Sequence, residues 1–241
     1  MKLRLMAAAA ALFAAAPALA GPPYLTDDPV PTDIGHWEIY AFTEGEGQHS
    51  TFDGDAGFDL NYGPMKNVQL TSTLPLDLSH EAQDGWRDGT GDVELGVKYR
   101  FLHDEKHGVS AAIFPRAILP TSTLATAERT RFLLPLWIGK DFPGGTSLFG
   151  GGGYEFNPGR GNRGFWQAGV ALTQDLNKDL SVGAEITRQG ADTIGGTDQT
   201  RAGIGAIIHI GGPASLYLSG GPSWADRRTL YRFYASVGFI F

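Results

Sequence analysis

Apolar and polar residues alternate along most of the chain beyond residue 34. Successive side chains of a β-strand point to opposite faces, so this period of two predicts strands with one apolar and one polar face. Apolar residues at helical spacing are rare beyond the first twenty positions, which predicts few helices. The clearest strand pattern covers residues 92–101. Its apolar face carries Val93, Leu95, Val97, Tyr99 and Phe101, and its polar face carries Asp92, Glu94, Lys98 and Arg100.

Turn-forming residues divide the chain into twelve segments of this kind. Each is about ten residues long, which is the length that a tilted transmembrane strand needs. The predicted strands cover residues 35–44, 53–63, 67–78, 91–102, 108–120, 131–141, 146–156, 164–176, 180–189, 199–211, 214–223 and 230–241.

The connections between these segments alternate in length. Those after even-numbered strands are short, such as 64–66 and 212–213, whereas those after odd-numbered strands are longer and more polar, such as 45–52 and 79–90. Outer-membrane barrels combine short periplasmic turns, long external loops and an even strand number. The pattern therefore predicts an all-β fold over residues 35–241, a transmembrane antiparallel up-and-down β-barrel of twelve strands with both termini periplasmic. A soluble β-sandwich has no reason to sort its loops in this way.

The first residues have the pattern of a secretory signal peptide, which we assign to residues 1–20. Lys2 and Arg4 precede an apolar run over residues 5–16, and the small residues of 18–20 offer a cleavage site. The run is shorter than the roughly 20 apolar residues that span a bilayer. We therefore expect the chain to be exported.

A Pro-rich N-terminal arm, residues 21–34, separates the signal from the first strand. Proline lacks a backbone N–H, so the arm is expected to stay outside the strand ladder. Two placements are open. The arm either lies in the periplasm, or residues 22–33 fold into the lumen as a plug and meet Lys98, Arg100 or Arg116.

The last segment alternates apolar residues up to the C-terminal Phe241. A final strand of this kind resembles the signal that the barrel assembly machinery reads, so we expect that machinery and outer-membrane lipid as partners. Aromatic residues near strand ends fit the girdles at the two membrane interfaces. They are Trp37, Tyr62, Tyr99, Trp166, Trp224 and Tyr231.

Composition narrows the class further. Glycine accounts for 34 of the 241 residues, about twice its average share. It is interleaved with apolar residues in the predicted strands, which indicates small residues on the inward face. The chain has no cysteine, hence no thiolate chemistry, and its formal net charge of −7 without a basic block argues against a nucleic-acid partner.

Three short motifs could carry chemistry, but their context argues against it. The G-x-G-x-x-G pattern at 159–164 precedes a strand, whereas a dinucleotide site requires a helix there. His103 and His107 lie in a predicted turn rather than on one face of a helix. Ser79 and His80 could serve a barrel hydrolase, yet adjacent strand residues point to opposite faces. We expect no enzyme activity, no metal and no cofactor.

Charged residues within the predicted strands form the remaining candidate site. Most lie opposite the apolar stripe and would line the lumen, where they could replace the hydration shell of a passing solute. Alternatively, opposite charges could pair across the lumen and seal it. The candidates are Asp59, Asp92, Glu94, Lys98, Arg100, Arg116, Lys140, Glu155, Glu185, Arg201 and Arg232.

Two segments resemble a known family. Residues 91–101, GDVELGVKYRF, resemble a strand motif of a family of outer-membrane transporters named after the meta-pathway of phenol degradation. Residues 22–29, PPYLTDDP, followed by 36–38, HWE, resemble the mature start of many members. The resemblance implies a channel for small compounds, aromatic or hydrophobic ones among them, and it transfers no catalytic residue.

The sequence therefore predicts a protein of the cell outer membrane that passes small solutes through its lumen by passive diffusion. A sealed structural or sensor-like barrel is the first alternative, and a barrel lipid hydrolase is the second. Because trimeric porins are usually larger, the chain length favours a monomer.

Overall fold

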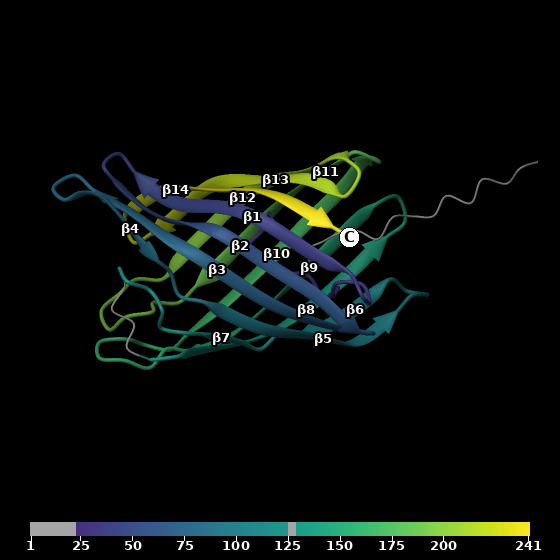
Figure 1. The fold of residues 1–241 in the computed structure, drawn as a ribbon, viewed down its shortest axis with the longest axis horizontal. Helices are drawn as coiled ribbons and strands as arrows, with labels where there is room; N and C mark the ends of the chain where they lie inside the picture. Colours follow the sequence, from purple (N-terminus) through teal and green to yellow (C-terminus); the bar gives the residue numbers. More distant parts are fainter. Residues whose placement is uncertain (1–22, 125–128) are drawn as a thin grey trace, which may run out of the picture.

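The fold is a closed barrel of β-strands (Figure 1). It is seen in a computed structural model that describes residues 23–124 and 129–241, so the predicted signal peptide lies outside the described residues. In the described part no helix is long and apolar enough to cross a membrane. The strands are β1 (Trp37–Gln48), β2 (Thr51–Met65), β3 (Val68–Glu81), β4 (Gly85–Thr90), β5 (Glu94–Asp104), β6 (Val109–Ile113), β7 (Arg116–Ile118), β8 (Arg131–Phe142), β9 (Thr146–Phe156), β10 (Phe165–Asn177), β11 (Leu180–Gln189), β12 (Gln199–Gly211), β13 (Ala214–Ala225) and β14 (Arg228–Ile240).

Pairing of the first and last strands closes the sheet. Every strand pair is antiparallel, and β1 joins β14 over most of its length. The strands β4 and β5 both pair with β3, whereas β6 and β7 both pair with β5 and β8. The described residues therefore form twelve barrel strands, two of them interrupted. The predicted twelve-stranded antiparallel barrel is confirmed.

Three predicted strands have the observed bounds, namely 146–156, 180–189 and 199–211. Two predicted loops are wrong for most of their length, because 45–52 and 79–90 belong largely to the hairpins β1–β2 and β3–β4. Outside the hydrocarbon layer both faces of a strand can be polar, so the alternation disappears while the ladder hydrogen bonds continue.

A proline interrupts the predicted strand 108–120. Pro115 has no N–H to donate to the ladder, so β6 ends before it and β7 begins after it. The neighbouring Phe114 N–H still donates to Pro135 O at 3.1 Å, and Pro115 O accepts from Val97 N at 3.1 Å. The wall therefore stays closed at this break.

The two faces of the wall differ as the alternation predicts. On β5, Val97 and Tyr99 are 43% and 47% exposed on the outside, whereas Lys98 between them is 3% exposed. Similar apolar residues project outward from the other strands and form a belt that lipid can cover. Members of this belt are Leu70, Leu95, Leu134, Leu136, Ile138, Val170, Leu172, Ile186, Ile204 and Phe239.

Aromatic side chains stand at both rims of the belt. Trp37 stacks on Tyr62 with ring centroids 4.7 Å apart, and Trp166 and Tyr231 are strongly exposed at the opposite rim. Trp86, on β4, extends this second rim. Trp and Tyr favour membrane interfaces, so the two rims fit the predicted girdles.

The two ends of the barrel are distinct. One end, here called the turn end, carries short connections such as 66–67 and 143–145, together with the start of β1 and the C-terminus (Figure 1). The other end, the loop end, carries longer connections such as 157–164 and 190–198. The site described below runs between these ends.

Candidate solute passage

Ten of the eleven predicted lumen residues lie on the inward face of the wall. Alternation along each strand brings them there, opposite the apolar belt. Lys140 lies instead on the outward face of β8, where its ammonium is 5.4 Å from the ring centroid of Phe142 and donates to His107 O. It shares the parity of Phe132 and Ile138, so it does not line the lumen. The inward ten are Asp59, Asp92, Glu94, Lys98, Arg100, Arg116, Glu155, Glu185, Arg201 and Arg232.

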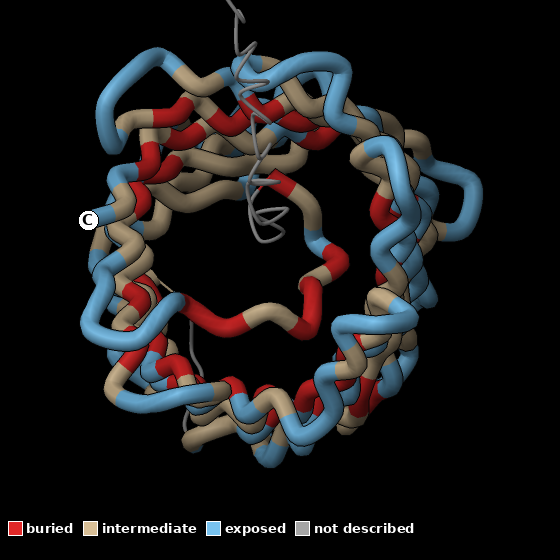
Figure 2. The backbone as a smooth tube through the Cα atoms, turned by 90° about the vertical axis from the view of Figure 1, so that its right-hand side faces the viewer, coloured by how far each residue is buried: buried red, intermediate tan, exposed pale blue. Residues whose placement is uncertain are grey.

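The N-terminal arm crosses the inside of the barrel (Figure 2). Near the turn end, Gly35 N donates to Gly63 O at 2.7 Å. From there the arm reaches the wall at β5 and then the wall at β11 to β13. Thr26 and Asp28 in the arm are fully enclosed, at 0% and 1% exposure. Of the two placements left open by the sequence, the arm adopts the one in the lumen.

Glu185 on β11 anchors the tip of the arm. Its carboxylate accepts hydrogen bonds from Leu25 N at 3.1 Å, and from Thr26 N and Thr26 Oγ1, both at 3.0 Å. The guanidinium of Arg232 on β14 pairs with the same carboxylate. Hydrogen bonds to a charged acceptor are stronger than neutral ones, so this cluster is a firm attachment.

Two further contacts attach the middle and base of the arm. Lys98 Nζ lies 2.9 Å from Asp27 Oδ1, both groups being shielded from solvent. Gln69 Oε1 accepts from Thr32 N at 2.9 Å and from Thr32 Oγ1 at 3.1 Å. Of the cations expected from the sequence to meet the arm, Lys98 does so, whereas Arg100 donates to Asn67 Oδ1 instead.

Glycine clears space for the arm on the inner wall. A Cβ on Gly169 would lie 2.4 Å from Thr26 Oγ1, and one on Gly183 would lie 2.3 Å from the hydroxyl of Tyr24. Both distances are well below van der Waals contact. The high glycine content therefore serves, at these positions, to let the arm approach the wall.

Asp28 is a buried acid within the arm. Its Oδ1 accepts from Val30 N at 2.5 Å, and its other oxygen has no hydrogen-bond partner among the described residues. Burial raises the pKa of the Asp28 carboxyl well above its usual range, and the neighbouring charges of Lys98, Asp27 and Glu38 modify this effect. The protonated form of Asp28 therefore favours the docked arm.

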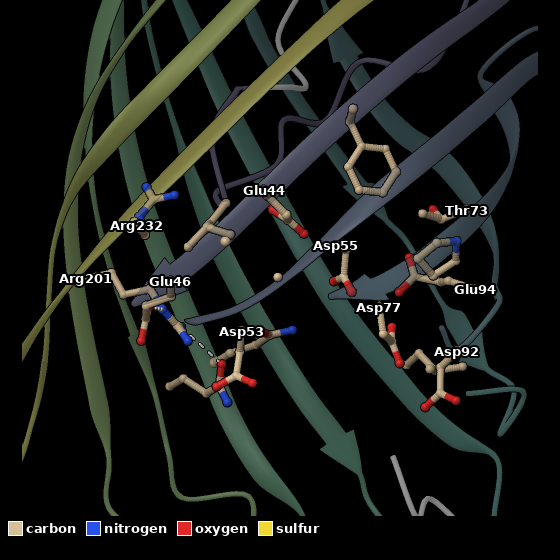
Figure 3. A pocket seen from close by; sticks show the side chains of 18 of the residues that line it. Glu44, Glu46, Asp53, Asp55, Thr73, Asp77, Asp92, Glu94, Arg201 and Arg232 are labelled. Atoms are coloured by element: carbon tan, nitrogen blue, oxygen red, sulfur yellow. Dashed lines mark hydrogen bonds and ion pairs between the residues drawn. The ribbon is translucent and has the colours of Figure 1, made fainter. Parts of the chain in front are cut away.

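Two cavities remain beside the arm. The outer one, about 890 Å³, opens at the loop end, and its wall carries the acidic side chains shown in Figure 3. The inner one, about 320 Å³, lies between the arm and strands β1, β2, β3, β5 and β14. Residues that line both cavities mark the place where they meet. They are Leu25, Phe42, Glu44, Thr73, Glu94, Arg116 and Arg232.

Ion pairs along the lumen involve most of its cations. Arg116 contacts Glu94 at 2.9 Å, and Arg201 contacts Glu46 at 3.3 Å. Arg131 bridges two carboxylates, Asp92 at 3.1 Å and Glu155 at 3.0 Å. The pairs of Arg116 with Glu94 and of Arg131 with Glu155 join neighbouring strands along the wall, and all of these pairs leave the two cavities in place.

Several inward polar residues were not predicted from the sequence. Glu44 ends a predicted strand, Glu46 falls in a predicted loop, and Arg131 begins a predicted strand. Gln69 and Thr26 are uncharged and were not expected to hold the arm. Continuing the strand parity through the loop at 45–52 would have placed both glutamates on the inner face.

The other motifs stay without a role in the described residues. The glycine-rich stretch 159–164 is a loop at the loop end. His107 Nδ1 contacts Asp104 at 2.6 Å within its own turn, and His80 contacts Ser50 O rather than Ser79. Within residues 23–124 and 129–241, no group of three or more His, Cys, Asp or Glu side chains could hold a metal ion.

Outer-membrane barrels of known structure resemble this chain. The COG4313 outer membrane channel from Pseudomonas putida F1 superposes with a TM-score of 0.67 and 13% identity, covering 92% of this chain and 100% of that one. The KdgM porin in complex with disordered oligogalacturonate gives 0.60 and 10%, covering 84% and 98%. The translocator domain of the autotransporter NalP from Neisseria meningitidis gives 0.51 and 16%, covering 86% and 89%.

The likeness shows the fold. The likeness, at 10 to 16% identity, is to barrels of the outer membrane and concerns the arrangement of the strands. The link to phenol degradation stays a prediction. Neither protein-family models nor curated protein sequences gave a match to this chain.

Proposed function

We propose that this chain is a passive channel of the outer membrane, which passes small solutes through its lumen beside the inserted arm. The observation that supports this most directly is the pair of cavities, about 890 and 320 Å³, which share lining residues along the lumen. A sealed barrel would have its interior filled by side chains. Of the ten inward charged residues named above, eight line these cavities and would line the route, whereas Arg100 and Glu185 line neither cavity.

We propose that the turn end faces the periplasm, together with both termini. Connections at this end have two to four residues, whereas some at the other end, such as 157–164 and 190–198, are longer, as in outer-membrane barrels. The last strand, β14, and the residue after it present Phe233, Phe239 and Phe241 on the outward face, which suits recognition by the barrel assembly machinery.

Aromatic or hydrophobic compounds are the solutes that the family resemblance suggests. The inner cavity offers aromatic walls, since Tyr24, Tyr40, Phe42, Phe114 and Tyr234 line it. Aromatic rings provide large apolar contact for a solute. The first similar structure is an outer membrane channel and another is a porin, which is consistent with transport.

Deleting residues 23–33 tests the proposal. The refolded protein is inserted into planar bilayers, and single-channel conductance is compared with that of the intact chain. We expect a measurable conductance for the intact chain and a larger one after the deletion, because the arm occupies part of the lumen. Absence of current from both proteins would contradict a channel and favour the sealed barrel.

The hydrolase alternative gains no support from the described residues. A nucleophile and its base must lie within hydrogen-bond reach. Ser79 lines the outer cavity, whereas His80 contacts Ser50 O and the ring of Trp86, 5.0 Å away. Ser79 and His80 are therefore not arranged as a catalytic pair.

A further inference from the structure

A row of carboxylates crosses three neighbouring strands on the inner wall. Glu44 on β1 stands opposite Asp55 on β2, and Asp55 stands opposite Asp77 on β3. All three line the outer cavity (Figure 3). Like charges directly opposite on adjacent strands destabilise a sheet. Such a row is therefore expected to serve a purpose other than stability.

Among the described residues, no cation of the wall forms an ion pair with this row. Arg116 and Arg201 are each held by another carboxylate, at 2.9 and 3.3 Å, and Arg131 is held by two. Arg232 belongs to Glu185, which also binds the arm. Among the described cations that line the outer cavity, Arg87 alone has no ion pair. The same described wall carries five carboxylates without an ion pair, which are Glu44, Asp53, Asp55, Asp77 and Glu81.

In the inner cavity, too, more carboxylates than cations lack an ion pair among the described residues. Its three cations, Lys98, Arg116 and Arg232, are each paired with a carboxylate. Four of its carboxylates have no cation partner among the described residues. These are Asp33, Glu38, Glu44 and Asp59.

The excess of carboxylates acts strongly on a passing ion because the passage is enclosed by protein. Charges inside a protein are screened less than those in bulk water, and rings of Asp or Glu select cations in channels. Glu44 lies where the two cavities meet, so a solute that passes from one to the other passes this carboxylate. Beside it, the rings of Phe42 and Tyr234 offer faces that attract cations.

We propose that the passage selects small positively charged solutes, both inorganic cations and organic ammonium compounds, through the carboxylate row Glu44–Asp55–Asp77. This inference rests on the proposed channel function and narrows its solute class. Anions meet a net negative potential in both cavities, whereas cations are drawn along the wall of β1, β2 and β3.

Reversal potentials in planar bilayers test the selectivity. The intact chain is placed under a salt gradient of KCl, and then of choline chloride as an organic ammonium probe. We expect a permeability ratio of cation to chloride on the order of tenfold. The isosteric triple variant Glu44→Gln, Asp55→Asn and Asp77→Asn should bring this ratio close to unity while the channel still conducts.

Glu105→Gln is the matched control. Glu105 is strongly exposed in a turn at the turn end, outside both cavities, so its loss should leave the ratio unchanged. Current without cation preference in the intact chain would overturn the inference and keep the channel. The inference would also be overturned if the triple variant kept the full permeability ratio of cation to chloride while its heat-dependent gel mobility showed that it was folded. No current from either the intact chain or the arm deletion would instead overturn the channel itself.

Discussion

Glu185 holds the tip of the arm, so its change should release that tip. Glu185→Gln keeps the shape of the side chain and removes its charge. In the wild type, three hydrogen bonds join the carboxylate to Leu25 and Thr26. Each bond to a charged acceptor contributes about 1.5–3 kcal/mol, whereas a neutral one contributes about 0.5–1.5 kcal/mol.

The amide oxygen of glutamine can keep at most two of these bonds, both as neutral ones. At the low end of both ranges, the docked arm should therefore lose about 3.5 kcal/mol relative to the released arm, a roughly 300-fold shift in their ratio. Single-channel recording measures this shift as the fraction of time spent in the higher-conductance state. We expect that state to be rare in the wild type and frequent in the variant.

Glu155→Gln provides the comparison. Glu155 is about as buried as Glu185, 6% against 5% exposed, and it also pairs with an arginine. Its ion-pair partner, Arg131, lies on the wall rather than on the arm. A Val30→Cys substitution gives a second readout, because the chain has no cysteine of its own. A thiol reagent should label it faster after release. If Glu185→Gln matched Glu155→Gln in both assays, the assigned anchor would be refuted.

Three other changes to the arm and the wall have expected outcomes. Gly169→Ala places a Cβ 2.4 Å from Thr26 Oγ1 and should raise conductance by displacing the arm, whereas Gly220→Ala, which faces outward, should not. Equal conductance of the two variants would argue against a need for glycine where the arm contacts the wall. Because burial raises the pKa of Asp28, docking takes up a proton, so the docked state is favoured at low pH and weakens as the pH rises through the raised pKa. Recordings across pH should show more opening at high pH, and Asp28→Asn, which mimics the protonated acid, should remove this dependence; an unchanged slope would exclude Asp28 as its source. Val97→Arg puts a charge into the apolar belt and should lower the stability of the folded barrel by about 2–4 kcal/mol, measured by urea titration in lipid vesicles, and a loss below about 1 kcal/mol would mean that Val97 does not face the hydrocarbon.

Most of the fold could be predicted from local sequence patterns. Alternation and turn residues located strands such as β9 and β11 to the residue, because side-chain period and ladder hydrogen bonds are properties of neighbouring positions. Lys140 was misplaced for a physical reason. The inner face of β8 is itself apolar, with Leu133 and Trp137 buried there, so the strand gives little contrast between its faces.

The residues that hold the arm could not be predicted from local sequence patterns. Leu25 and Glu185 are 160 positions apart, and Thr32 and Gln69 are 37 apart. Pairs at such separation leave no periodic trace in a single sequence. The sequence could indicate that an acidic, Pro-rich segment would meet cations in the lumen, but the carboxylate that holds its tip was not foreseeable.

The long separation between the arm and its anchor has a consequence for biogenesis. Hairpins between consecutive strands close short loops, whereas the contact of Leu25 with Glu185 encloses 160 positions and gains nothing until β11 is in place. Insertion of the arm is therefore a late event, after the wall around it exists. A chain truncated before β11 would keep the contacts of the arm with Gln69 and Lys98, but its Leu25–Thr26 end would stay unattached.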